Sequence, residues 1–249
     1  MNDARRAAAI VPVRLDSQRL PRKAMLAESG TPLFLHTWQR AVEASAFDRV
    51  VVATDSDEIE VAARDAGADV VRTSAGCRTG SERCAEAAGE LGPAYGFFVN
   101  IQGDWPEVAP ADLDALVTCL RSGSAPTATL AVPLTEPERI ADPNVVKVVR
   151  GLDARALYFS RATIPFVRGA HGVTHLRHIG VYAFDRETLL QLPELPSSGL
   201  AETESLEQLR LLENGIPMHV LDATGCPWGI ESRPDYDAFL ERLHHSNRS

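Results

Sequence analysis

The feature that most limits the fold of this chain is a series of short, almost wholly apolar runs, separated by segments with helical periodicity. The first four runs cover residues 7–13, 49–53, 69–72 and 97–101. Strands that are apolar along their whole length are typical of parallel sheets with helices on both faces. The alternation therefore predicts an α/β protein with a mainly parallel sheet.

Helices are expected in the intervening segments, where apolar residues recur every three or four positions. The predicted helices cover residues 31–45, 55–67, 81–91 and 112–121. Thr31 suits the N-cap of the first of these helices and Pro32 suits its first helical position. Gly67 suits a helix C-terminus.

After residue 126 the pattern changes to longer strands with turn-rich links. Strands are expected at 127–132, 145–150, 177–184 and 216–221, and helices at 202–213 and 232–243, followed by a frayed tail that begins with His244 and His245. Residues 126–184 therefore indicate a β-rich excursion with added or antiparallel strands. A chain of 249 residues fits within one domain, so we predict a single domain over residues 1–249.

Composition limits the partners and the compartment. A formal net charge of −9 and a pI near 5.3 argue against a nucleic-acid-binding or membrane-binding protein, because both partners need a basic face. No apolar stretch is long enough for a membrane span or a secretory signal, so we expect a cytoplasmic protein. The cysteines lack the spacing of a zinc site, and we expect free thiols with neither disulfide nor zinc at Cys77, Cys84, Cys119 and Cys226.

A basic loop at residues 14–23 directly follows the first strand and carries Arg14, Arg19, Arg22 and Lys23. Ligands of open parallel sheets bind beyond the carboxyl ends of the strands. Arginine forks and a lysine point charge suit a polyphosphate and the charge that grows on a departing pyrophosphate. A solvated basic loop is the simpler alternative. The glycine spacings of dinucleotide-binding and P-loop sites are absent, which disfavours a Rossmann dehydrogenase or a P-loop kinase.

One aspartate and the two lysines of the sequence are further candidates for the site. Asp104 follows the strand at 97–101 and should project over the same sheet edge as the basic loop. Its carboxylate suits Mg²⁺, which prefers oxygen ligands and substrate phosphates, although a turn or capping role explains it equally well. Lys23 and Lys147 are the only lysines among 25 basic residues, so a compact ammonium is required at Lys23, while the role of Lys147 stays open.

Seven segments carry a resemblance to a known family. They are I-V-P-V-R-L-D-S-Q-R-L-P-R-K from residue 10, T-G-S-E-R from 79, V-N-I-Q-G-D-W-P from 99, V-K-V-V from 146, Y-F-S-R-A-T-I-P from 158, L-R-H-I-G-V-Y from 176 and L-E-Q-L-R from 206. Together and in this order they resemble the 3-deoxy-manno-octulosonate (Kdo) cytidylyltransferase family. The resemblance implies a Rossmann-like nucleotide-diphospho-sugar transferase fold, CTP, Mg²⁺ as cofactor, pyrophosphate release and a homodimer.

The resemblance also implies roles for individual residues. The catalytic residues that bind the triphosphate would be Arg14, Arg19 and Lys23. The nucleotide would contact Pro12, Arg14, Ser17, Thr79, Gly80, Ser81, Arg83 and Gln102. A carboxylate-bearing acceptor would contact Arg161, His178, Tyr182, Glu207 and Gln208, and the metal would be held by Asp104 and Glu231. Without the resemblance, His178 would be interpreted as a core histidine, Glu207 and Gln208 as surface residues and Trp228 as a packing residue.

The sequence departs from the family pattern at four places. Trp105 replaces a glutamate, Glu231 replaces an aspartate and Arg22 replaces a glycine, and the segment 166–176 is several residues shorter than usual. The shorter segment and Trp105 predict fewer contacts to a sugar tail, so the acceptor is either a Kdo-like sugar acid or a small phosphonate such as phosphonoformate. The added charge of Arg22 would suit a more anionic acceptor.

Two rival functions stay open at this point. The changes at Trp105 and Glu231 would also fit a non-catalytic regulator that binds CTP or a sugar nucleotide. A nucleotidyltransferase of the same fold that uses UTP, GTP or dTTP is the other alternative.

The excursion at 126–184 is predicted to bind the acceptor and to form the dimer contact.

Overall fold

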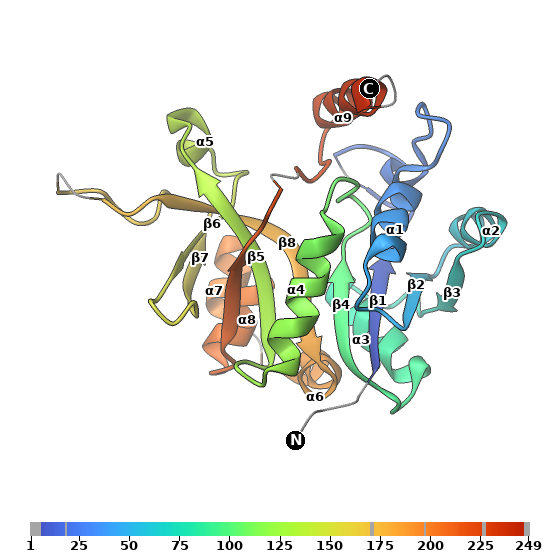
Figure 1. The fold of residues 1–249 in the computed structure, drawn as a ribbon, viewed down its shortest axis with the longest axis horizontal. Coiled ribbons are helices and arrows are strands. Elements are labelled where there is room, and N and C mark those ends of the chain that lie inside the picture. The colour runs from blue at the N-terminus through green and yellow to red at the C-terminus, as the bar shows by residue number, and fades with distance from the viewer. Residues whose placement is uncertain (1–5, 18, 170–171, 197, 226–227, 247–249) are drawn as a thin grey trace.

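The computed structural model describes residues 6–17, 19–169, 172–196, 198–225 and 228–246 (Figure 1). Within these residues nine strands form one mixed sheet, in the order β3-β2-β1-β4-β8-β5-β9 with β6 and β7 attached beside β8. Helices pack against both faces of the sheet. The α/β prediction is therefore confirmed.

The first half of the sheet is wholly parallel. β1 (Arg6–Pro12) lies between β2 (Arg49–Thr54) and β4 (Tyr95–Ile101), and β3 (Asp69–Arg72) extends the sheet beyond β2. Residues 7–11 of β1 have no exposed surface, because a central strand is covered on both faces. All four strands predicted for this half are confirmed.

The second half of the sheet is mixed, as the change of pattern after residue 126 predicted. β8 (His175–Asp185) runs antiparallel to β4 and to β5 (Thr127–Leu134), while β9 (Met218–Asp222) runs parallel to β5. β6 (Lys147–Arg150) and β7 (Ala156–Ser160) form an antiparallel hairpin beside β8. The sequence pattern did not predict β7, a short strand that leaves Leu157 exposed and so lacks a uniformly apolar pattern.

Two sets of helices cover the two faces of the sheet. α1 (Leu33–Glu43), α2 (Asp57–Asp65) and α4 (Pro110–Arg121) share one apolar core with one face. α3 (Gly80–Leu91), α6 (Arg186–Gln191) and α8 (Gln208–Glu213) share a second core with the other face. The remaining short elements are η1 (Lys23–Met25), α5 (Pro137–Ala141), η2 (Leu192–Glu194) and α7 (Gly199–Glu204).

The last helix, α9 (Arg233–Ser246), anchors the basic loop. Tyr236 and Phe239 of this helix pack with Leu20 and Leu33 in a third, smaller core. Because Leu20 lies between the cations of the basic loop, this packing fixes the loop against the rest of the molecule. α9 continues to Ser246, so the predicted frayed tail at residues 244–245 is wrong and both histidines belong to its last turn.

Two other predicted helix boundaries are also wrong. α1 begins at Leu33, and its N-cap is Pro32 and not the predicted Thr31. Thr31 instead lies in a turn with Ser29, whose Oγ donates to the Thr31 carbonyl at 2.8 Å and lies 3.3 Å from the Thr31 backbone nitrogen. The predicted helix at 202–213 is two helices, α7 and α8. Ser205 adopts a left-handed conformation with φ of 53° and ends the first of them.

Two further findings concern the expected compartment and the cysteines. No helix in the described ranges is long and apolar enough to cross a membrane. Cys77, Cys84 and Cys119 are free thiols, and Cys226 lies outside the described residues. Burial, together with a hydrogen bond to Glu86, raises the pKa of Cys77 to about 11, and burial raises the pKa of the other two thiols, so all three stay protonated at neutral pH.

Candidate functional site

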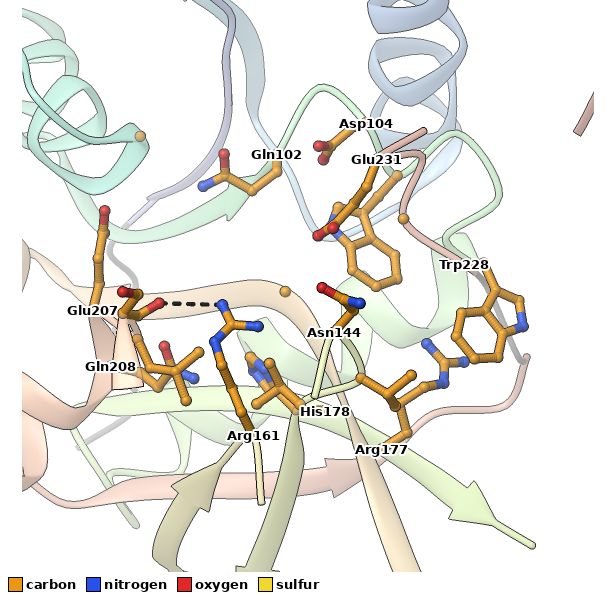
Figure 2. Close-up of a pocket in the computed structure, with 18 of the residues that line it drawn as sticks. Gln102, Asp104, Asn144, Arg161, Arg177, His178, Glu207, Gln208, Trp228 and Glu231 are labelled. Atoms are coloured by element: carbon orange, nitrogen blue, oxygen red, sulfur yellow. Dashed lines mark hydrogen bonds between the residues drawn. The ribbon is translucent and has the colours of Figure 1, made fainter. Parts of the chain in front are cut away.

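Two adjoining hollows open where β1 and β4 end. The smaller, of about 340 Å³, is bordered by the basic loop, and the larger, of about 550 Å³, extends towards the β-rich excursion (Figure 2). The residues that border both hollows are Arg14, Arg19, Gln102, Asp104 and Glu231. The ends of β1 and β4 thus meet the connection between β9 and α9, which brings together residues more than 200 positions apart in the sequence.

The cations of the basic loop lie against the two predicted metal ligands. Lys23 Nζ donates to Asp104 Oδ2 at 2.5 Å and to the carbonyl oxygen of Ile230 at 2.8 Å. Arg19 forms an ion pair with Glu231. Positive and negative groups therefore neutralise one another at the mouth of the site, in the arrangement expected where cationic phosphate ligands and acidic metal ligands meet.

Not every residue of the basic loop faces the site. Pro12 and Ser17 border the smaller hollow, as predicted for nucleotide contacts. Arg22 borders neither hollow in the described part of the chain and instead forms an ion pair with Glu58 of α2. The expectation that Arg22 adds charge for a more anionic acceptor is therefore wrong. Its backbone is left-handed, with φ of 54°, at a position where glycine would be unstrained.

The N-terminus of α3 forms another wall of the larger hollow. Thr79 caps this helix by accepting a hydrogen bond from the backbone nitrogen of Glu82 at 3.2 Å. Gln102 Nε2 donates to Asn100 Oδ1 at 3.2 Å. A Cβ atom on Gly80 would lie 2.6 Å from Gln102 Nε2, so a larger residue at this position would require the Gln102 amide to move. The predicted residues Thr79, Gly80 and Gln102 thus lie together.

Two predicted nucleotide contacts do not border either of these hollows. Arg83 is buried and forms an ion pair with Asp55 at 3.2 Å and a hydrogen bond with Thr73. It therefore connects α3 to the ends of β2 and β3, and the sequence pattern did not reveal this structural role. Ser81 is also buried, with Asn100 Nδ2 3.5 Å from its hydroxyl. Arg78, which was not predicted, borders the larger hollow.

His178 lies buried on β8 at the edge of the larger hollow. Its Nε2 is 2.9 Å from Thr129 Oγ1, and the single hydroxyl hydrogen of Thr129 points to the carbonyls of Ile179 and Val181. The ring therefore donates through Nε2. Burial, and then the charge of Arg177, lowers the pKa of His178 to about 3, so the imidazole is neutral at physiological pH.

Tyr182, also on β8 and with its ring centroid 5.4 Å from that of His178, lies beside Glu207 and Gln208. The Tyr182 hydroxyl donates to Gln208 Oε1 at 3.2 Å, while Gln208 Nε2 is buried and makes no hydrogen bond to a described residue. Burial and the nearby Glu207 raise the pKa of Tyr182. Desolvation by the surrounding protein raises the pKa of Glu207, which borders the larger hollow. Hydrogen bonds from Ser81 and Thr79 act in the opposite direction and lower this pKa.

Arg161 reaches the same hollow but also connects three backbone segments. Its Nε donates to the Glu204 carbonyl at 2.7 Å, and its two terminal nitrogens donate to Pro143 and Ser205 carbonyls at 3.0 Å and 3.4 Å. Three of its five N–H groups are thereby accounted for, and two are left for a ligand.

Lys147, whose role the sequence left open, is a clamp beneath the larger hollow. The side chain has no exposed surface, and Nζ donates to the carbonyls of Asp142 and Arg161 at 2.9 Å and 2.5 Å. Burial lowers the pKa of Lys147. The clamp therefore holds together two backbone segments that border the site.

Five further residues border the larger hollow that were not predicted as site residues, although Trp105 was noted as a departure from the family pattern. This group comprises Trp105, Arg139, Asn144, Arg177 and Trp228. Cβ atoms added to Gly180 and Gly229 would lie 3.3 Å and 3.1 Å from the Trp105 ring, so the indole packs tightly between the two glycines. Trp228, interpreted from sequence as a packing residue, borders the hollow with two arginines on its ring. No sequence signal connected these residues.

The site also contains a donor set that fits a divalent cation. Asp104 and Glu231 face the same hollow (Figure 2), and their oxygens are of the kind that Mg²⁺ prefers. Within the described ranges no group of three or more His, Cys, Asp or Glu side chains converges on one point. Mg²⁺ commonly completes its shell with water and substrate phosphates, so two carboxylates suffice for this metal.

Comparisons with known proteins agree with this geometry. The model of the cytidylyltransferase family matches residues 8–220. A 3-deoxy-manno-octulosonate cytidylyltransferase of Chlorobium limicola is 42% identical over 244 residues, which are 96% of this chain and 98% of the relative. One from Nitratidesulfovibrio vulgaris is 42% identical over 252 residues, covering 99% of this chain and 100% of the relative. The Zea mays protein of the same name is 40% identical over 93% of this chain and 79% of its own length.

Solved structures give the same result. The structure of CMP:2-keto-3-deoxy-manno-octonic acid synthetase complexed with CTP superposes with a TM-score of 0.91 and 32% identity, over 97% of this chain and 99% of that one. A 4-diphosphocytidyl-2C-methyl-D-erythritol synthase from Anaerococcus prevotii shares the fold, with a TM-score of 0.66 and 13% identity.

The fold and the site together define an enzyme of the CTP-dependent nucleotidyltransferase class with the nucleotide-diphospho-sugar transferase fold. The chain belongs to the cytidylyltransferase family, and within it to the Kdo cytidylyltransferases. The family and the fold class predicted from the seven sequence segments are thereby confirmed.

Proposed function

We propose that this enzyme transfers the CMP group of CTP to a carboxylate-bearing acceptor and releases pyrophosphate. An acceptor oxygen attacks the α-phosphorus in line, while the bond between the α-phosphorus and the bridging oxygen of the β-phosphate breaks. The observation that carries the proposal is the convergence of Arg14, Arg19 and Lys23 with two carboxylates around one hollow. The cations stabilise the charge on the departing pyrophosphate without a covalent enzyme intermediate.

Asp104 and Glu231 are the residues that would hold Mg²⁺. Bound Mg²⁺ would supply positive charge beside the α-phosphate. Each carboxylate is paired with a cation of the basic loop. When the metal and the triphosphate bind, the carboxylates would contact the metal and the cations would contact the phosphates. We expect Asp104→Asn to raise the Mg²⁺ concentration for half-maximal turnover by at least about tenfold. A Mg²⁺ titration that matches the unchanged protein would remove Asp104 as a ligand.

CTP is the nucleotide that we propose, and the solved relative was complexed with CTP. Thr79, Gly80 and Gln102 border the larger hollow, where they would surround the nucleoside. UTP, GTP and dTTP are the competing possibilities. Thermal melting with each nucleotide distinguishes them, because the tighter ligand raises the melting temperature more. An equal or larger rise with another nucleotide would assign that nucleotide instead.

Two acceptors are supported by different observations. The curated relatives carry the name of 3-deoxy-manno-octulosonate, which supports a Kdo-like sugar acid. The Trp105 ring on the wall of the hollow and the nearby Arg139 and Arg177 support a smaller, more anionic acid such as phosphonoformate. Arg161 has N–H groups for the carboxylate of either compound. Pyrophosphate release with CTP, Mg²⁺ and each acid in turn is the deciding experiment.

The same screen tests the rival function of a non-catalytic regulator. CTP binding without pyrophosphate release, for both acids and a wider panel of 2-keto acids and phosphonates, would support the regulator. Release with any member of the panel would support the enzyme. The pairing of Lys23 with Asp104 supports the enzyme, because it places a cation and a carboxylate where transfer of a metal-bound nucleotide needs both.

We further propose a homodimer formed through the β-rich excursion. Large apolar side chains are exposed on the β6–β7 hairpin and on the segment that precedes β8, and they are Leu152, Leu157, Phe166, Val167 and Val173. Clustered exposed apolar residues on a soluble enzyme mark a contact surface. A second copy of this chain is the proposed occupant.

A further inference from the structure

Three side chains from separate elements meet on the wall of the larger hollow. The Cζ atom of Arg177, on β8, lies 4.0 Å from the ring centroid of Trp228, and that of Arg139, on α5, lies 4.8 Å from it. Trp228 comes from the connection between β9 and α9. We call these three residues the Trp228 stack. Figure 2 shows Trp228 and Arg177 together, with Arg161 at a separate point of the wall.

Arg139 of the Trp228 stack differs from Arg19 and Arg78, which also border the larger hollow. Arg19 is paired with Glu231 and Arg78 with Glu82, so a carboxylate neutralises each of them. Arg139 forms no ion pair within the described ranges, and its contact is the indole ring. The stack therefore brings two cations to one ring within a wall that also contains Asn144.

Stacking on an indole suits anion binding. A guanidinium over an aromatic face uses its flat side for the ring and keeps its N–H groups, which lie in its plane, for other partners. Two guanidiniums held at one ring also concentrate positive charge on this wall, and an anionic group offsets that charge. Arginine pairs of this kind favour carboxylate, phosphate or phosphonate groups, which accept two parallel hydrogen bonds.

We propose that the Trp228 stack is a second anion subsite, which receives an anionic group of the acceptor other than the carboxylate bound at Arg161. This assignment rests on the proposed function, since it takes the larger hollow as the acceptor site. The preferred acceptor is then an acid with two anionic groups, and Arg139 and Trp228 determine this specificity. Asn144 adds an uncharged side chain beside the subsite.

Succinate and succinamate test the subsite, because they have nearly the same shape and differ by one negative charge. Their affinities for the CTP-loaded protein are measured by calorimetry, so the result does not depend on turnover. We expect the unchanged protein to bind succinate about tenfold more tightly than succinamate. Arg139→Gln and Trp228→Leu should reduce that ratio to about two or less, while CTP affinity stays within about twofold.

Arg121→Gln is the matched control, because Arg121 is an exposed arginine on α4 that does not border either hollow. It should leave the ratio unchanged. Equal binding of the two acids by the unchanged protein would overturn the proposal, as would variants that weaken both acids equally. If no acceptor supports pyrophosphate release but succinate is still preferred, the proposed function fails and the subsite stands.

Discussion

At the residue scale, Lys23 and Arg22 are neighbours in the basic loop with different partners. Lys23 donates to Asp104 and to the Ile230 carbonyl at the mouth of the site. Arg22 pairs with Glu58 on α2, away from both hollows. We expect Lys23→Ala to lower kcat by about 100-fold or more, because one fixed cation beside the triphosphate is removed. Steady-state pyrophosphate release measures this loss, and circular dichroism checks the fold.

Arg22→Gly provides the internal comparison for that experiment. The left-handed backbone of Arg22 costs about 1 kcal/mol in a residue with a side chain, and glycine relieves it. We therefore expect turnover within about twofold of the unchanged protein. Normal turnover in Lys23→Ala, or an equal loss in Arg22→Gly, would contradict the roles given to these residues.

His178 gives the protein a stability that depends on pH. Its pKa is about 3 in the folded chain and 6.5 when unperturbed, so between these values the unfolded chain binds more protons. Stability is therefore full above pH 6.5 and decreases as the pH falls towards 3, by about 2 kcal/mol between pH 7 and pH 5. Denaturant unfolding at both pH values should show a smaller loss in His178→Gln, and an equal loss would exclude a buried neutral histidine.

At the element scale, the N-terminus of α3 depends on one glycine. A Cβ atom on Gly80 would lie 2.6 Å from Gln102 Nε2, whereas a Cβ atom on Gly89 of the same helix would meet nothing within 4 Å. We expect Gly80→Ala to displace Gln102 and to raise the KM for CTP by about tenfold. Gly89→Ala should leave KM unchanged and stabilise the protein by about 0.5–1 kcal/mol.

Both substitutions add one methyl group to α3, so a difference in KM between them reports the contact between Gly80 and Gln102. Kinetics at varied CTP and thermal melting are measured on the two variants together. If Gly80→Ala keeps the original KM, Gln102 has no part in binding the nucleotide.

The elements also show which features of the fold can be predicted from the sequence. The parallel half of the sheet was predictable, because strands covered on both faces must be apolar along their length. The break between α7 and α8 was not, since it depends on tertiary contacts. Glu204, at the end of α7, accepts hydrogen bonds from Ser160 Oγ at 2.6 Å and from the backbone nitrogen of Arg161 at 2.9 Å. Ser160 is the last residue of β7 and Arg161 is the next residue, and the sequence pattern did not predict this strand.

The same distinction applies to the site. The basic loop and Asp104 were predictable, because both directly follow strands whose carboxyl ends share one sheet edge. The Trp228 stack was not predictable, because its residues come from three elements that only the folded chain brings together. Arg83 illustrates the opposite case. Its motif suggested a nucleotide contact, but its burial beside Asp55 gives it a structural role.

At the scale of the whole molecule, the β-rich excursion should form the contact between two copies of the chain. Phe166 is 83% exposed, and Leu157 of β7 is also largely exposed. Leaving such side chains in water costs about 2 kcal/mol each relative to burial. We expect the unchanged protein to elute as a dimer in size-exclusion chromatography with light scattering, and Leu157→Ser with Phe166→Ser to shift it towards the monomer.

Val61→Ser is the control for this prediction, because Val61 is 59% exposed on α2, far along the chain from the excursion. Removing one exposed apolar side chain there should not change the oligomeric state. A monomeric unchanged protein would contradict the dimer, and a dimer that survives the double substitution would locate the contact elsewhere. Because Lys147 holds the Arg161 backbone within the excursion, loss of the dimer should also raise the KM for the acceptor more than the KM for CTP.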